Sequence, residues 1–141
     1  MLNVTTSEHL PQIAAWIKAD PFHEKVSENN PEFLLTGNGE ISFRVEDKLG
    51  TVFFFRLDKE GDLLRWAGQF GPREEVSKRR LVIAMLREGL PFIIAFARKN
   101  GYKGVVFESV NPPLIAFLGK QGFKSVGDAD YQLTIEDNTH V

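Results

Sequence analysis

The segment from Thr51 to Leu57 constrains the fold most strongly, because it is apolar and aromatic apart from Thr51 and Arg56. Successive side chains of a strand point to opposite faces of a sheet, so a strand of this composition should be buried on both faces. A second apolar segment, Gly104 to Ser109, is rich in valine and predicts another buried strand. The chain therefore needs a sheet whose central strands are shielded from water.

Two further strands are expected beside the first of these segments. Ile41 to Glu46 alternates between apolar and polar residues, and Leu63 to Phe70 contains several large apolar residues. The connections are short: Asp47–Gly50 places a glycine near the end of a hairpin turn, and Lys59–Asp62 is also typical of a turn. We therefore expect three antiparallel strands that form a meander.

Helical spacing of apolar residues marks two other regions. After a short strand from Leu2 to Thr5, a helix is predicted with Ser7 as its N-cap and Asp20 as its end, because Asp20 precedes a proline. A long helix is predicted from Glu74 to Asn100. Pro91 lies inside it and either kinks the helix or begins a second one.

The last part of the chain predicts one more helix and two closing strands. The helix should span Pro112 to Gln121, and the strands Phe123 to Val126 and Tyr131 to Ile135. Strands and helices thus follow one another in a mixed α/β order. A chain of 141 residues with 43% hydrophobic residues is expected to form a single domain, residues 1–141.

Composition excludes several classes of function. The chain has no cysteine, which removes disulfides and thiolate chemistry. Its formal net charge of −2 gives no electrostatic basis for binding nucleic acid or an anionic membrane. The longest apolar stretch, Leu90–Ala97, is far too short to span a bilayer, and the amino-terminal residues do not resemble a signal peptide. We therefore expect a cytoplasmic protein.

A motif from Asn111 to Phe123 connects the sequence to a known family. An asparagine follows the buried strand, a short helical segment comes next, and the segment closes with Lys120–Phe123, which is lysine, glutamine, glycine and phenylalanine. Singly, Asn111 is an ordinary helix cap and Gly122 an ordinary turn glycine. At this spacing they resemble the end of the cofactor-binding core in the GNAT superfamily of acyl-CoA N-acyltransferases, and the order of elements along the chain is similar to that family as well.

The resemblance implies a fold and a ligand. The fold would be a mixed sheet of about seven strands with a long central helix and a short C-terminal helix. Acetyl-CoA would lie between two splayed parallel strands, Leu63–Phe70 and Gly104–Ser109, with its pyrophosphate at the amino end of the long helix. The residues expected to contact it are Phe70, Gly71, Lys78, Arg79, Arg80, Asn111 and Phe117.

The sequence departs from the family at two positions. The family's pyrophosphate loop is best matched by Arg79–Ala84, but Val82 stands where its first glycine is expected. The basic residues Lys78, Arg79 and Arg80 offer charge pairing instead, although such a cluster is also typical of a solvated first helical turn. The tyrosine that protonates the leaving thiolate in many family members is replaced by Leu118.

The base that would accept the proton of the amine is open between two candidates. Glu108 lies on the predicted strand Gly104–Ser109, and His23 lies in the irregular segment Phe22–Gly39. Glu108 is equally compatible with an edge carboxylate beside a basic neighbour, and His23 with packing over the sheet. The three histidines are scattered and show no spacing typical of a metal site.

Two functions remain at this point. The first is acyl-CoA-dependent N-acyl transfer to a small-molecule or peptide amine, with a homodimer compatible with the sequence. The second is a GNAT-fold module for binding or assembly that has lost its chemistry. The motif Asn111–Phe123 favours transfer, whereas Val82 and Leu118 favour the module.

Overall fold

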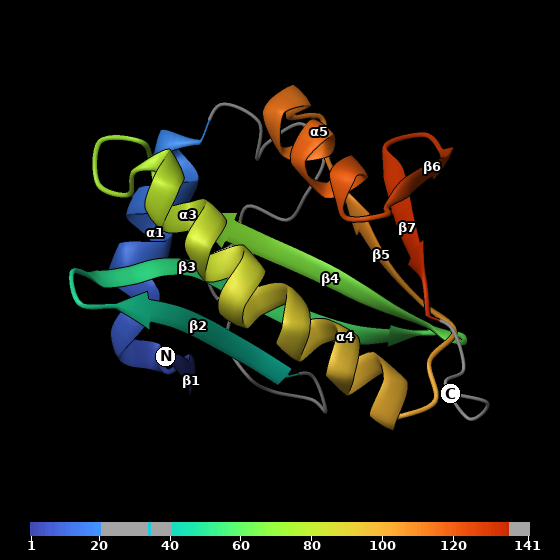
Figure 1. The fold of residues 1–141 in the computed structure, drawn as a ribbon. Helices are drawn as coiled ribbons and strands as arrows, with labels where there is room; N and C mark the ends of the chain where they lie inside the picture. Colours follow the sequence, from blue (N-terminus) through green and yellow to red (C-terminus); the bar gives the residue numbers. More distant parts are fainter. Residues whose placement is uncertain (21–33, 35–40, 136–141) are drawn as a thin grey trace.

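We describe the fold from a computed structural model, which describes residues 1–20, 34 and 41–135 (Figure 1). Within these residues, seven strands form one mixed sheet in the order β1-β2-β3-β4-β5-β7-β6. The strands are β1 (Leu2–Val4), β2 (Ile41–Asp47), β3 (Gly50–Glu60), β4 (Leu63–Phe70), β5 (Gly104–Glu108), β6 (Lys124–Gly127) and β7 (Asp130–Thr134). The predicted mixed α/β sheet is thereby confirmed.

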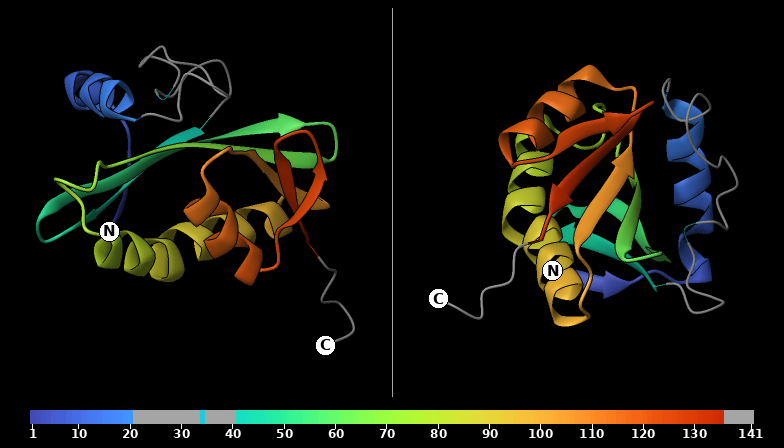
Figure 2. Two further views of the ribbon diagram at one scale, coloured as in Figure 1. Left: turned by 90° about the horizontal axis from the view of Figure 1, so that it is seen from above. Right: turned by 90° about the vertical axis from the view of Figure 1, so that its right-hand side faces the viewer.

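Helices cover both faces of this sheet. They are α1 (Leu10–Ala19), α3 (Lys78–Ala84), α4 (Leu90–Lys99) and α5 (Pro112–Lys120). Figure 2 shows α1 on one face and α3, α4 and α5 together on the opposite face. None of the helices in the described part of the chain is long and apolar enough to cross a membrane.

The centre of the sheet is aromatic and buried on both faces. Phe53, Phe54 and Phe55 of β3 are fully buried, which confirms the expectation from their uninterrupted apolar segment. Phe54 points to the face of α1, where its ring lies 5.3 Å from that of Trp16. Phe55 points to the other face, where its ring lies 6.2 Å from that of Phe92 on α4. The core therefore extends through the sheet.

The predicted meander is present, and the predicted parallel pair follows it. β2, β3 and β4 pair antiparallel, and β3 is longer than expected, so its turn to β4 tightens to Gly61 and Asp62. β4 then pairs parallel with β5, but only from Leu63↔Gly104 to Arg65↔Val106. Beyond Arg65 the two strands separate, and this separation positions the candidate site.

The long helix differs from the prediction at its start and in its middle. It begins at Lys78, not Glu74, because Ser77 caps it by accepting a hydrogen bond from the Arg80 amide at 3.2 Å. Between α3 and α4 the helix continues through a π-helical turn, Met85–Gly89, in which the Leu90 amide bonds to the Met85 carbonyl. This wider turn accommodates Pro91 in the first turn of α4. Of the two expectations for Pro91, the structure confirms that it begins a second helical segment.

Gly89 lets the long helix lie close to the sheet. A Cβ atom at this position would lie 2.6 Å from the Phe53 ring, which is closer than two carbon atoms can approach. The π turn thus coincides with a close approach of the helix to β3 at Phe53. The packing of helix against sheet therefore depends on a glycine in the helix interior, where it carries a propensity cost of about 1 kcal/mol.

The amino-terminal helix corrects one further expectation. A short 3-10 turn, Ser7–His9, precedes α1, and Thr6 rather than Ser7 is the cap residue. The buried side chains of α1 are Ile13 and Trp16, and Ile17 packs against the core. The helix ends at Asp20, whose extended backbone agrees with the effect of the following proline.

Candidate functional site

A cavity of about 410 Å³ lies where β4 separates from β5. It is lined mainly by apolar side chains, with a few charged residues among them. The lining residues come from α1, from the end of β4 and the loop after it, from α3, and from the start of α5; they are Trp16, Ala19, Asp20, Phe70, Gly71, Pro72, Arg73, Glu74, Val76, Lys78, Leu81, Val82, Met85, Asn111, Pro113, Leu114 and Phe117.

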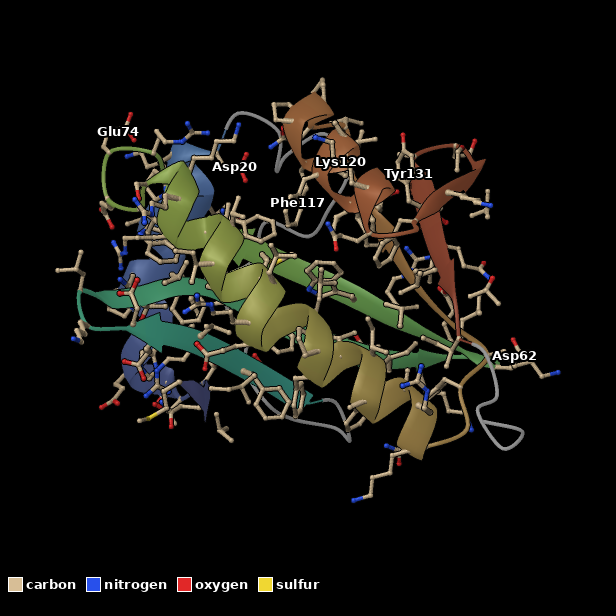
Figure 3. All side chains as sticks on the ribbon, in the orientation of Figure 1. Asp20, Asp62, Glu74, Phe117, Lys120 and Tyr131 are labelled. Carbon is tan, nitrogen blue, oxygen red and sulfur yellow. The ribbon has the colours of Figure 1, made fainter. Side chains whose placement is uncertain are left out.

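The α5 wall is built by the motif that the sequence singled out. The Asn111 side chain caps α5 by accepting a hydrogen bond from the Leu114 amide at 3.5 Å, as predicted. Figure 3 shows Phe117 pointing from α5 toward β4, and Phe117 lines the cavity. Leu118, where many family members have tyrosine, is fully buried in the core. The structure thus gives Leu118 a packing role.

The end of β4 forms the floor of the cavity. Phe70 contacts Phe53 with ring centroids 5.6 Å apart, and the Gly71 amide bonds to the Val52 carbonyl at 3.1 Å. A Cβ atom at Gly71 would lie 2.2 Å from the Val76 side chain. Glycine is therefore required for the loop after β4 to fold back tightly against the cavity.

The α3 wall differs from the pyrophosphate loop that the resemblance suggested. The segment that best matched this loop, Arg79–Ala84, is helical from end to end, and the side chain of Val82 lines the cavity. Lys78 also lines it. Within the described chain, the amides of Lys78 and Arg79 have no hydrogen-bond acceptor, which is typical of the first turn of a helix. This end of the long helix therefore offers two free donors beside two cations.

Arg80 is engaged elsewhere. Its guanidinium donates two hydrogen bonds to the Asp47 carboxylate, each of 2.7 Å, and a third to the Glu75 carbonyl at 2.9 Å. The hydrogen bond from Arg80 holds the pKa of Asp47 below its usual value, and Asp47 raises the pKa of Arg80. A contact between Arg80 and a phosphate would require this ion pair to open.

Glu108 lies outside the lining of the cavity, at the end of β5. Its direct neighbour across the strand pair is Asp130 on β7. Burial raises the pKa of Glu108, and the charge of Asp130 adds to this effect, whereas Arg65 opposes it. His23, the other candidate base, lies outside the described residues, as does nearly all of the irregular segment Phe22–Gly39.

Arg65 joins three strands at the point where β4 and β5 part. Its guanidinium donates to both carboxylate oxygens of Asp130, at 3.0 and 3.2 Å. It also donates to Glu60 on β3, with a shortest distance of 2.9 Å. Arg65 therefore links β4 to β3 and β7 at the point where β4 and β5 separate. Its positive charge partly compensates the negative charges of Asp130 and Glu108.

No protein-family model and no curated protein matches the sequence. Solved structures do match the fold. A GNAT-family acetyltransferase from Staphylococcus aureus Mu50 superposes with a TM-score of 0.72 at 12% identity, covering 96% of this chain and 99% of that one. The ribosomal-protein-S18-alanine N-acetyltransferase from Escherichia coli superposes with a TM-score of 0.68 at 15% identity, covering 100% and 97%. The chain has the GNAT fold.

A third GNAT structure bears on the ligand. The phosphinothricin acetyltransferase from Sinorhizobium meliloti, solved in complex with AcCoA, superposes with a TM-score of 0.65 at 14% identity, covering 100% of this chain and 91% of that one. The cavity of this GNAT-fold chain is lined by Phe70, at the end of β4, and by Asn111, which follows β5; these are the two strands that the sequence analysis expected to splay.

Sequence reasoning missed part of the cavity wall. Trp16 and Asp20 line it from α1, and Glu75 holds Trp16 by accepting a hydrogen bond from its indole nitrogen at 2.8 Å. The only signal at Asp20 was its place before a proline, which predicted a helix end and nothing more. Their role depends on how α1 packs across the sheet, and this could not be inferred from local patterns.

Proposed function

We propose that this GNAT-fold protein is an acyl-CoA-dependent N-acyltransferase with acetyl-CoA as the donor. The observation that carries the proposal is the cavity at the splay of β4 and β5, which combines an apolar interior with the amino end of a long helix. Cavities of about 300–1,000 Å³ with a few polar groups are typical of small-molecule sites. The likeness to an acetyltransferase bound to AcCoA supports the choice of donor.

The residues around the cavity fit such a donor. Among the described residues, β4 pairs only with β3 past Arg65, so its other edge presents backbone groups that can bond to the amides of the pantetheine arm. The free amides of Lys78 and Arg79, together with their side chains, suit a diphosphate at the helix amino end. Phe70, Gly71, Asn111 and Phe117 would bound the arm on its other sides. Arg80 would contribute at longer range while it stays paired with Asp47.

Acetyl-CoA supplies an acyl group that is already activated as a thioester. The protein would contribute mainly by holding amine and thioester in attack geometry, which can lower a barrier by about 7–11 kcal/mol. An amine similar to lysine is mostly protonated near pH 7, so a base must remove one proton before the nitrogen attacks. Glu108 and His23 remain the candidates for this step. With Leu118 buried, the leaving thiolate would take its proton from water.

The same proposal assigns a small-molecule or peptide amine as the acceptor and a cytoplasmic location. The matched structures include enzymes whose names give a ribosomal-protein alanine and phosphinothricin as acceptors. A binding or assembly module without chemistry is the second candidate, and Val82 in the cavity wall is the observation that favours it. A valine side chain keeps a ligand farther from the helix backbone than glycine does.

Two measurements separate these functions. In a thermal melting experiment, acetyl-CoA should stabilise the protein by about 2.7 kcal/mol at a ligand concentration 100 times the Kd. Release of free thiol from acetyl-CoA should then depend on an added amine, tested with phosphinothricin and with a peptide that begins with alanine. Stabilisation without thiol release would support the module. No stabilisation by acetyl-CoA or CoA would overturn the transferase.

A further inference from the structure

We propose that the indole N–H of Trp66 donates a hydrogen bond to the carbonyl oxygen of the bound acyl group and stabilises the negative charge that this oxygen gains during transfer. The inference rests on the proposed N-acyl transfer and assigns a catalytic residue to it. Trp66 directly follows Arg65, the last residue of β4 that pairs with β5, so it lies where the two strands begin to diverge (Figure 1).

Aromatic neighbours hold the Trp66 indole in place. Trp66 is 3% exposed, and its ring lies 5.6 Å from that of Phe107 on β5 and 6.4 Å from that of Phe123, which follows α5. Among the described residues, its Nε1 atom is buried and has no hydrogen-bond partner. A buried tryptophan N–H usually finds a partner, because an unpaired donor in the interior lowers stability. An N–H that is held in place and left unpaired is therefore a candidate donor to a ligand.

Gly68 leaves the space beside this N–H without a side chain. Residues two apart on a strand share a face, so Trp66, Gly68 and Phe70 follow one another along β4, and Phe70 lines the cavity. A Cβ atom at Gly68 would lie 3.5 Å from Trp66 Nε1 and 3.8 Å from Phe70 Cζ. The backbone at Gly68 does not have the positive φ that would require glycine. A glycine inside a strand often marks a site where a ligand approaches closely, and this one connects the N–H to the cavity.

The carbonyl oxygen of a thioester is the atom that most needs such a donor. The nitrogen of the neutral amine bonds to the carbonyl carbon, and the π electrons of the C=O bond move to its oxygen. When the C=O bond re-forms, the C–S bond breaks with its electron pair on sulfur. The nitrogen releases one proton, and the thiolate takes one from water. A fixed N–H that is shielded from water stabilises the charge on oxygen without reorganising during the reaction.

The first test compares acetyl-CoA with S-ethyl-CoA, a thioether of nearly the same size that has no carbonyl oxygen. Each is added to the ¹⁵N-labelled protein, and the two indole N–H signals are followed. We expect acetyl-CoA to move the Trp66 signal downfield and S-ethyl-CoA to leave it nearly unchanged, while both ligands shift the amides of Lys78 and Arg79. The Trp16 indole already donates to Glu75 at 2.8 Å, so it should respond equally to both ligands.

The second test removes the donor. The unmodified protein should bind acetyl-CoA about two- to tenfold more tightly than S-ethyl-CoA, as expected for one additional hydrogen bond, and Trp66→Phe should abolish this preference. Trp66→Phe should also lower kcat for amine-dependent thiol release by about 100-fold or more, as the loss of one oxyanion donor does. Phe107→Leu is the matched control, because it loosens the same aromatic cluster but keeps the N–H, so the preference should survive.

The third test fills the space beside the donor. Gly68→Ala should weaken the binding of acetyl-CoA more than that of free CoA, because its methyl group occupies the position next to Trp66 Nε1. The new Cβ atom would also lie 3.3 Å from the Phe54 carbonyl, so a thermal melt without ligand measures any accompanying loss of stability.

Three results would each overturn the inference: an equal response of the Trp66 signal to both ligands, no response to acetyl-CoA, or a preference for acetyl-CoA that survives in Trp66→Phe. If Lys78 and Arg79 respond to both ligands while Trp66 does not distinguish them, the inference alone fails and the proposed transferase stands. If neither ligand shifts any signal, both fail.

Discussion

Two helix amino ends, those of α3 and α5, face the same cavity, yet only one of them is open to an anion. At α5, Pro112 and Pro113 have no amide hydrogen, and the Leu114 amide is used by the Asn111 cap. At α3, the Ser77 cap uses only the Arg80 amide. The motif Asn111–Phe123, the sharpest in the sequence, thus forms a part of the cavity wall whose first helical turn has no free amide. The amino end of α3, which departs from the family pattern, keeps the free amides of Lys78 and Arg79.

The largest expected effect follows from removing the cations at the open end. The double variant Lys78→Ala/Arg79→Ala should weaken CoA binding by about 100-fold or more, because two charge-assisted hydrogen bonds of about 1.5–3 kcal/mol each are lost. Isothermal titration checks this value. The remaining affinity should also vary less with salt, since fewer exposed charge pairs are screened.

A matched control lies at the other end of the same long helix. Arg98→Ala/Lys99→Ala removes the same charge from the last turn of α4, and CoA binding should be nearly unchanged. If both double variants weaken binding equally, the effect is one of net charge, and the assignment of the α3 amino end is wrong.

The next effect concerns Arg65, at the point where β4 and β5 separate. Arg65→Gln should lower the free energy of unfolding by about 1–3 kcal/mol, because it removes the hydrogen bonds to Asp130 and Glu60. It also leaves the neighbouring carboxylates of Asp130 and Glu108 without this cation. Denaturant unfolding measures the change. Lys103→Gln breaks only the exposed pair with Asp62, 3.7 Å apart, and should have almost no effect. Equal losses in the two variants would contradict the role of Arg65.

The two caps offer a smaller and sharper comparison. Asn111→Ala and Ser77→Ala should each cost about 0.5–2 kcal/mol of stability, as the loss of a helix cap usually does. Only Ser77→Ala frees another amide at the open end, so it should preserve CoA affinity or raise it relative to Asn111→Ala. Thermal melts with and without CoA give both quantities. A larger loss of affinity in Ser77→Ala would count against the open end as the anion site.

The smallest effect is the pH dependence of Glu108. Because burial and Asp130 raise its pKa in the folded protein, the folded state disfavours the carboxylate, and stability falls as pH rises from the unfolded pKa through the higher folded value. Glu108→Gln should therefore be slightly more stable than the unmodified protein at pH 7. The difference should vanish near pH 3, where the carboxyl is protonated in both states. A Tm difference that is the same at both pH values would show that the titration of Glu108 is not its cause.

The features that local patterns control were predictable from the sequence. The cap at Asn111, the prolines after it and the aromatic strand β3 each depend on residues that are adjacent in the chain. Even the parallel pairing of β4 with β5 followed from the resemblance of the motif to a known family.

The features that depend on contacts between distant segments were not predictable. The long helix starts at Lys78 and widens at Met85–Gly89, where the packing of Gly89 on Phe53 decides the geometry. The pairing of Arg80 with Asp47 joins residues 33 positions apart. The cavity role of Asp20 requires α1 to lie across the sheet from α3, which no local spacing encodes.

The central claim is tested most directly by following the backbone amides of both helix ends while CoA is added to the ¹⁵N-labelled protein. The account predicts that the signals of Lys78 and Arg79 shift most and move downfield, as expected for amides that gain a phosphate acceptor. The signals of Leu114 and Ile115 should shift less, because both amides already bond to Asn111. Shifts centred on α5, or no shifts at Lys78 and Arg79, would contradict it.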